Sequence, residues 1–265
     1  MIDRDIKRIL EDQQAFHGSF LPLPDRDTTP DTTESGPELG AEPEPEPEQS
    51  SGNDPAHADP WARLLSAIPV KSPLHGLNSL DEVADYVART ILVPIDKTRT
   101  NPVPGVGNPN ADLMIIGEAP GADEDRMGVP FVGRAGKLLD KILGAIDFSR
   151  DDVYIANILK SRPPNNRDPE PDEIKAHLPI LLRQIYLVKP RLLLCVGRVA
   201  GNVLLEQKTT LKALREKNFH DFHGVPMMVT YHPAALLRSS TYKRPTWEDV
   251  QALRVRFDEI VAASK

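Results

Sequence analysis

Apolar runs alternate with amphipathic stretches along most of the chain. Four runs are almost continuously apolar and predict buried strands, at 112–117, 153–159, 191–197 and 225–231. Stretches with helical periodicity predict helices at 135–147, 172–188, from about 199, and at 247–262. Strands separated by helices indicate an α/β fold. We expect a three-layer α/β/α sandwich around a central, mostly parallel four-stranded sheet.

Two local signals refine this picture. Ser79 followed by Glu82 is a capping box, which predicts a helix running through about Arg89. The pair His223-Gly224 stands just before the last apolar run and predicts a hairpin turn. With the apolar pattern beginning near Trp61, we expect one globular α/β domain over 61–265.

The first 60 residues have a different composition. Ile2, Ile6, Ile9 and Leu10 fall near helical spacing and predict a short amphipathic helix at 3–16, within a segment 1–18. Segment 19–60 is rich in Pro, Glu, Asp, Ser and Gly, so it cannot bury enough apolar surface and is expected to be a disordered acidic linker. The helix is interpreted as a solvated or weakly docked arm, in preference to a peptide that binds a repair or replication protein.

Charge divides the chain in the same way. The net charge is −7, but residues 1–60 hold 4 Lys/Arg and 15 Asp/Glu, so 61–265 keep 28 basic and 24 acidic residues, a net of +4. The domain is therefore mildly basic, which is compatible with nucleic-acid binding.

The single cysteine, Cys195, excludes an internal disulfide and suits a reducing compartment. With no apolar run long enough for a bilayer and no secretory signal, we expect a monomeric cytoplasmic enzyme.

Unusual polar segments follow three of the predicted strands. They read GEAPGADED (117–125), KSRPPNNR (160–167) and YHPAALLR (231–238). Each alone is compatible with ordinary turn chemistry, since Gly and Pro end strands. Ligands of open parallel sheets bind where the strands end, however, and three such segments would meet at one edge. We therefore expect a functional site there.

Four motifs carry a resemblance to a known family. GEAPGADED, PFVGRAGKLL (130–139), VYIANILKSRPPNNRDP (153–169) and TYHPAALLR (230–238) resemble, in order and spacing, motifs of the family 4 uracil-DNA glycosylases. These bacterial and archaeal enzymes usually carry a [4Fe–4S] cluster. The resemblance implies a monofunctional glycosylase of base excision repair that hydrolyses the N-glycosidic bond of uracil in DNA and leaves an abasic site.

The resemblance implies two catalytic residues. Glu118 would position or activate the attacking water, although a glutamate between glycine-containing turns also suits capping of the next segment. His232 would donate a hydrogen bond to uracil O2 and so stabilise the departing anion. The alternative for His232 is an ordinary histidine at a strand end.

Three further residues are implied to contact the base. The flipped uracil would stack on Phe131. Asn157, a costly amide within an apolar strand, would read the O4 and N3–H edge, where cytosine presents the reversed pattern. Glu124 would crowd C5 and reject the methyl group of thymine, with Asp123 and Asp125 as neighbouring candidates.

Two groups are expected to contact DNA. An apolar wedge followed by a cation would replace the extruded base in the duplex, and it comprises Leu236, Leu237 and Arg238. Three basic side chains would contact phosphates beside the lesion, namely Lys160, Arg162 and Arg167. The two leucines also suit a helix start that buries them.

The chain departs from the family at the cluster. Positions that hold four cysteines in similar enzymes are occupied by Thr90, Val93, Ser161 and His177. One histidine cannot replace four thiolates, so we predict no iron–sulfur cluster and no metal. A plug that includes Val93, His177 and Ile91 is expected to take its place.

Three other functions compete with this one. The same fold could accept another deaminated or damaged base, or bind DNA lesions without cutting. The third alternative is a nucleotide hydrolase on a similar sheet, but this chain lacks the GxxxxGK[ST] phosphate loop expected of such an enzyme.

Overall fold

The structure, a computed structural model, describes residues 60–263. The chain divides into two units, Met1–Ser51 and Gly52–Lys265, and the described residues belong to the second. The predicted helix at 3–16 lies outside the described residues. So does the predicted linker at 19–60, except for Pro60, which begins helix α2 (Pro60–Ser66).

A six-stranded sheet forms the centre of the fold, in the order β1-β3-β2-β4-β6-β5. The four inner strands are parallel and match the four apolar runs. They are β3 (Val153–Asn157), β2 (Leu113–Gly117), β4 (Leu192–Val196) and β6 (Val225–Thr230). Side chains of β2, β3 and β4 are buried throughout, as expected for parallel strands covered on both faces.

The expected count of four strands was too low. A short antiparallel strand lies at each edge of the sheet: β1 (Val106–Gly107) pairs with β3, and β5 (His220–Phe222) pairs with β6. The turn between β5 and β6 is the predicted hairpin, with His223 at φ 53° and Gly224 at φ 93°. Strand β1 has two exposed residues and no apolar alternation, so the sequence carries no signal for it.

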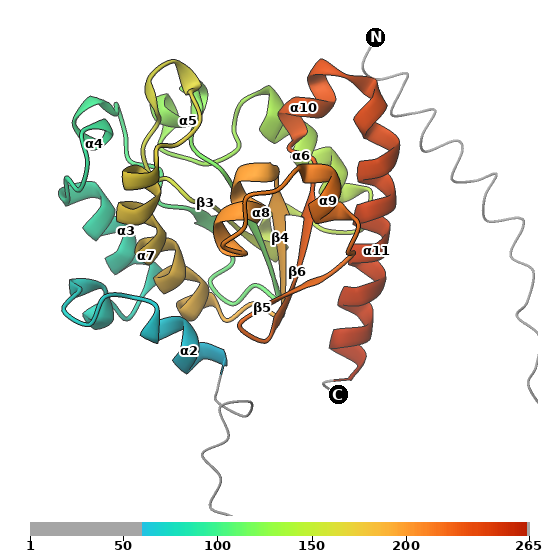
Figure 1. The fold of residues 1–265 in the computed structure, drawn as a ribbon, viewed down its shortest axis with the longest axis horizontal. Coiled ribbons are helices and arrows are strands. Elements are labelled where there is room, and N and C mark those ends of the chain that lie inside the picture. The colour runs from blue at the N-terminus through green and yellow to red at the C-terminus, as the bar shows by residue number, and fades with distance from the viewer. Residues whose placement is uncertain (1–59, 264–265) are drawn as a thin grey trace, which may run out of the picture. The chain divides into compact units, whose positions relative to one another are not determined.

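Helices cover both faces of the sheet, which confirms the three-layer architecture. Side chains of β2 alternate, so that Met114 joins one core and Ile115 joins the other. The first core includes residues of α2, α3 (Leu80–Arg89), α7 (Pro171–Val188), α8 (Arg198–Leu204) and α9 (Leu211–Arg215). The second includes residues of α6 (Arg134–Gly144) and α11 (Lys243–Ala262). Figure 1 shows α7 and α11 on opposite sides of the strands.

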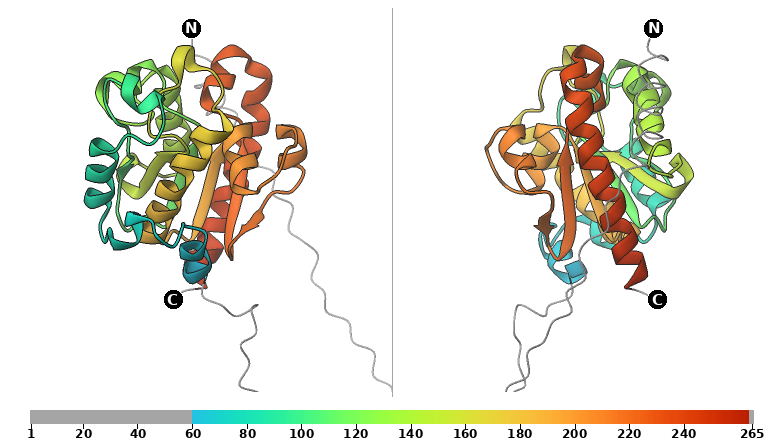
Figure 2. Two further views of the ribbon diagram at one scale, coloured as in Figure 1. Left: turned by 60° about the vertical axis from the view of Figure 1, so that its left-hand side comes forward. Right: turned by 90° about the vertical axis from the view of Figure 1, so that its right-hand side faces the viewer.

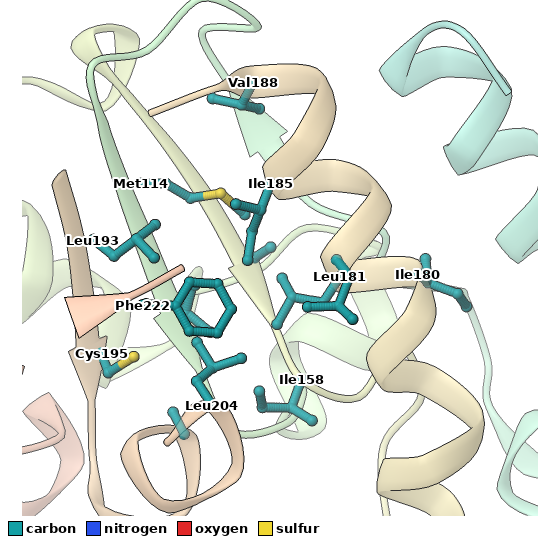
Figure 3. Close-up of a cluster of buried hydrophobic side chains, with 14 of the residues drawn as sticks. Met114, Ile158, Ile180, Leu181, Ile185, Val188, Leu193, Cys195, Leu204 and Phe222 are labelled. Carbon is teal, nitrogen blue, oxygen red and sulfur yellow. The ribbon is translucent and has the colours of Figure 1, made fainter. Parts of the chain in front are cut away.

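The close-up in Figure 3 shows how α7 packs on the sheet. Leu181 and Ile185 of α7 point toward the side of the sheet that carries Leu193 and Cys195 of β4, and Phe222 lies between the layers. The Cys195 side chain is fully buried, and burial raises the pKa of its thiol. Cys195 is therefore a core residue, away from any exposed loop.

Helix boundaries follow the sequence signals closely. Ser79 accepts a hydrogen bond from the N–H of Glu82 and begins α3, as the capping box predicts. Helix α11 begins at Lys243, four residues before the predicted start, because Pro245 fits the first turn of a helix. Figure 2 shows α11 running alongside the strands, with α2 at one end of the sheet and α10 (Pro233–Arg238) at the other. No described helix is long and apolar enough to cross a membrane.

Candidate active site

One cavity of about 470 Å³ opens at the carboxyl ends of the parallel strands. Helices α5 (Ala122–Met127) and α10 flank it, at the same end of the molecule (Figure 1). Seven of the predicted site residues line it: Glu118, Glu124, Phe131, Asn157, Arg167, His232 and Arg238. The three polar segments, which are widely separated in the chain, therefore meet as expected.

Asn157 and Glu118 stand on adjacent strand ends. Gly117 of β2 pairs in register with Asn157 of β3, and Glu118 follows directly. The Asn157 side chain is 2% exposed, and its Oδ1 has no hydrogen-bond partner among the described residues. A Cβ at position 117 would come within 2.2 Å of this Oδ1, so glycine is needed there. A buried amide oxygen left without a partner beside a cavity is a binding group for a ligand donor.

The Glu118 carboxylate is half-buried and makes no hydrogen bond to any residue that the structure describes. Burial, and secondarily the negative charge of Asp168, raise the pKa of Glu118 to about 7, while Arg198 opposes the shift. Burial disfavours the charged form because the carboxylate loses its hydration. A carboxylate poised near neutral pH is suited to accept a proton from water.

His232 lies at the start of α10, where its Nδ1 accepts a hydrogen bond from the N–H of Ala234 at 3.1 Å. Burial, assisted by the positive charge of Arg238, lowers the pKa of His232 to about 4. The imidazole is therefore neutral near pH 7. With Nδ1 acting as the acceptor, the ring proton sits on Nε2, which is free to donate to a ligand.

Phe131 is held in a left-handed backbone conformation, with φ 54°. Arg150 fixes it by donating to the Phe131 carbonyl at 2.9 Å, and Gly136 packs so closely that a Cβ would lie 1.8 Å from that oxygen. The Phe131 and His232 rings are 5.5 Å apart at 29°. A base between them would need about 7 Å, two contact distances. A ligand base must therefore use the part of the Phe131 face that His232 leaves open.

Among the three neighbouring acidic residues of α5, only Glu124 lines the cavity. Asp123 is exposed and pairs with Arg126, and Asp125 is buried and accepts hydrogen bonds from Thr100. The Glu124 carboxylate accepts the N–H groups of Val132 and Gly133 at 3.0 Å and that of Gly121 at 3.1 Å. It thereby ties α5 to the loop that carries Phe131.

Two of the predicted DNA contacts are wrong. Lys160 is fully buried, with Nζ bonded inside the domain, so it cannot reach a phosphate. Leu236 is 5% exposed, on the buried side of α10, so it cannot enter a duplex as the structure stands. Both predictions used residue type and place in a motif. Lysine is usually solvated, which favoured a phosphate contact for Lys160, and an apolar side chain just before a cation suits a wedge, which favoured Leu236.

The remaining DNA candidates keep a surface position. Arg238 is exposed at the cavity rim, and Leu237 beside it is half-buried. Arg167 lines the cavity but forks onto the Glu173 carboxylate at 2.6 and 2.9 Å, which competes with a phosphate. Arg162 donates to Asn166 at 2.7 Å and lies outside the cavity lining. Their contacts with DNA stay predictions.

Two charged residues of the cavity were not predicted from the sequence. Asp168 and Arg198 both line it and form an ion pair at 3.2 Å. Arg198 is the first residue of α8, after β4, and Asp168 follows the KSRPPNNR segment. For Arg198 the available signal was its place two residues after the end of β4, where site residues gather, and for Asp168 it was the adjoining KSRPPNNR segment, which was already expected at the site.

The four positions predicted to have lost cluster cysteines surround a buried polar network. Its centre is Asp96, which accepts from Ser161 Oγ at 2.5 Å and lies 3.2 Å from His177 Nε2. Arg99 donates to Ser161 at 3.1 Å and to the carbonyl of Thr90 at 3.3 Å. Although burial raises the pKa of Asp96, hydrogen bonds from His177 and Ser161 hold that pKa below its ordinary value.

This network does not fit an iron–sulfur cluster. Fe–S clusters need thiolates, and the one cysteine of the chain lies in β4. Within residues 60–263 no group of three or more His, Cys, Asp or Glu side chains could hold a metal ion. Val93 packs against the first core and His177 joins the network, as expected of a plug. Ile91 is 50% exposed, so its predicted part in the plug was wrong.

Comparison with known proteins identifies the family of this chain. The family model described as uracil DNA glycosylase superfamily matches residues 104–251, so the chain belongs to that superfamily. Within it, the chain is similar to type-4 uracil-DNA glycosylases. That of Archaeoglobus fulgidus is 42% identical over 168 residues, covering 61% of this chain and 84% of the relative. That of Saccharolobus solfataricus is 41% identical over 186 residues, covering 67% and 86%. That of Pyrobaculum aerophilum is 40% identical over 182 residues, covering 64% and 91%.

Proposed function

We propose that this protein is a uracil-DNA glycosylase, which hydrolyses the N-glycosidic bond of uracil in DNA and leaves an abasic site for base excision repair. The observation that carries the proposal is the unpartnered, buried Oδ1 of Asn157, in one cavity with Phe131, Glu118 and His232. The type-4 relatives, named for this activity, support it.

Base recognition follows from the chemistry of the Asn157 amide. Its Oδ1 accepts the N3–H of uracil while its Nδ2 donates to O4. The open part of the Phe131 face supports the ring by stacking. Glu124 lines the same cavity as His232 and Asn157, which supports its predicted position beside the bound base. We assign to Glu124 the exclusion of thymine's C5 methyl group.

The reaction replaces the bond between C1′ and uracil N1 with a bond from C1′ to water oxygen. As the C1′–N1 bond breaks, its electron pair passes to the base, and negative charge grows on uracil O2. Neutral His232 donates a hydrogen bond from Nε2 to that oxygen, which stabilises the anion without a full proton transfer. The ionised Glu118 holds the water, supports the cationic sugar and takes the proton that water releases.

DNA is the macromolecular partner in this proposal. We assign Leu237 and Arg238, beside the cavity mouth, to contacts at the vacated position, and Arg162 and Arg167 to flanking phosphates. A role of the N-terminal segment toward a repair or replication protein, a monomeric state and a cytoplasmic location remain predictions from the sequence.

We also propose that the protein works without a [4Fe–4S] cluster. The network around Asp96 joins the 90–99 segment to Ser161 and to α7. These are the same three segments that a cluster bound at the predicted cysteine positions would connect. Iron and sulfide analysis of anaerobically purified protein tests this. Background metal is expected, and stoichiometric iron with sulfide would overturn it.

The activity is tested with a labelled oligonucleotide that carries one uracil, incubated with the protein and then treated with alkali, which cleaves at abasic sites. Scission is expected with the wild-type protein and strongly reduced with Glu118→Gln and His232→Ala. An otherwise identical strand with thymine or cytosine should stay intact. Tight binding of the uracil strand without scission would instead identify a lesion-binding module, and preferred scission at another deaminated base would change the substrate.

A further inference from the structure

Lys160 is the largest fully buried side chain of the described domain, and the catalytic steps above do not use it. Its Nζ donates to the main-chain oxygen of Asn157 at 2.7 Å and to Oε1 of Gln184 at 2.6 Å. Among residues 60–263 no carboxylate lies within ion-pair distance of it. Burying a lysine without a counterion is costly, so a position that keeps one needs a reason beyond packing.

The rest of Lys160 is held as firmly as its side chain. Its N–H donates to Nδ1 of His177 at 3.0 Å, and its carbonyl accepts from Val103 at 2.9 Å. Through His177, the residue is joined to the Asp96 network. The amine therefore extends from a fixed point on the main chain, and a fixed donor can set the position of whatever it binds.

Gln184 fixes the other side of the amine. Its Nε2 donates to the Pro104 carbonyl at 2.8 Å and lies 3.3 Å from the Tyr154 hydroxyl. Because both N–H groups point that way, the amide oxygen must face Lys160. The short contacts of Nζ thus join α7 to the last residue of β3, the residue that carries the recognition amide.

We propose that Lys160 is a positioning residue for uracil recognition, which acts through Asn157 by anchoring its peptide carbonyl. This inference rests on the proposed function. The Asn157 side chain has no protein partner for Oδ1 to hold it, so its direction depends on how its main chain is fixed. Burial lowers the pKa of Lys160 to about 7, but the neutral amine still has hydrogens for both acceptors, so the anchor persists in either form.

The test is a double-mutant cycle measured under single-turnover conditions on a uracil-containing oligonucleotide. Lys160→Met removes the amine and keeps most of the volume. It should lower the excision rate about 10- to 100-fold, as expected when a recognition group is displaced by about 1 Å. In an Asn157→Ala background the same substitution should change the rate less than about threefold, because its target is already gone. Multiplicative losses in the two backgrounds would overturn the inference.

A second readout follows the pocket without DNA. The inhibition constant of free uracil should rise in Lys160→Met in parallel with the loss of rate, whereas a purely structural role would leave it unchanged for the folded fraction. The matched control is Arg183→Met, because Arg183 is also a buried cation of this region and donates to a main-chain oxygen, that of Leu77, away from the cavity. It should lower the melting temperature and leave both constants near wild type.

If Lys160→Met does not fold, Gln184→Met supplies the test, since it removes the acceptor that orients the amine. It should show a smaller loss with the same dependence on Asn157, and an unchanged rate with unchanged uracil inhibition would overturn the inference. Failure of the proposed function is distinguishable, because wild-type protein would then release no uracil at all.

Discussion

The ion pair at the cavity mouth should control the pH dependence of the enzyme. Burial is the main cause that raises the pKa of Glu118, and the negative charge of Asp168 is the second. Asp168 also pairs with Arg198 at 3.2 Å. Since Glu118 acts in its ionised form, the excision rate should rise with pH through an apparent pKa near 7. His232, with a pKa of about 4, is already neutral over this range and adds no second limb.

Asp168→Asn removes the raising charge and leaves Arg198, which lowers the same pKa, without its partner. We expect the apparent pKa of the rate to fall by about one unit, since a neighbouring charge shifts a carboxyl by this order. At pH 6 the ionised fraction of Glu118 would then rise from about one tenth to about one half, an increase of about fivefold in rate. At pH 8 the two proteins should be nearly equal.

Single-turnover rates from pH 5 to 9 with saturating protein measure this shift directly. The matched control is Asp112→Asn, which breaks an Asp–Arg pair of 2.9 Å with Arg191 at the opposite end of β2. Its profile should superimpose on that of the wild type. An unmoved limb in Asp168→Asn, or a limb displaced to higher pH, would refute the assignment of Glu118 as the titrating group.

Four further outcomes follow from the same geometry. Glu118→Gln should stabilise the fold by about 2–3 kcal/mol at pH 8 and by little below pH 4.5. The folded-state pKa of Glu118 is raised to about 7, so the wild-type protein loses stability as this carboxyl ionises with rising pH. Thermal melts at both pH values measure the difference. Gly117→Ala should abolish excision while the protein still folds, since the new Cβ would meet the Asn157 amide, and circular dichroism with the oligonucleotide assay separates the two effects. Leu236→Ala should cost about 2–4 kcal/mol in denaturant unfolding as a buried truncation, and an exposed-site value near zero would contradict its burial. Asp96→Asn should lower the melting temperature without changing the iron content, whereas bound iron in either protein would contradict the network.

The parts of the fold that are continuous in sequence could be predicted well. The apolar runs of β2, β3, β4 and β6 are buried on both faces, so their composition alone marks them. Short edge strands lack that signal, because β1 has only two residues and both are exposed. Helix α3 was predictable from its capping box, a signal that is entirely local.

The site was predictable where a motif fixes both residue type and strand end, as for Glu118, Asn157 and His232. It was not predictable where burial reverses the usual behaviour of a residue type. Lys160 is such a case, since its two acceptors come from a strand end and from a helix 24 residues away. Asp96 is another, because its partners stand 65 and 81 residues further along the chain.

In the proposed function, one pocket both reads uracil and hydrolyses its bond to deoxyribose. We would follow it by mass spectrometry of a single-uracil oligonucleotide incubated with excess protein. We expect free uracil together with an uncleaved strand that carries an abasic sugar in place of deoxyuridine. An unchanged strand that stays bound, or a shortened strand with no free uracil, would refute it.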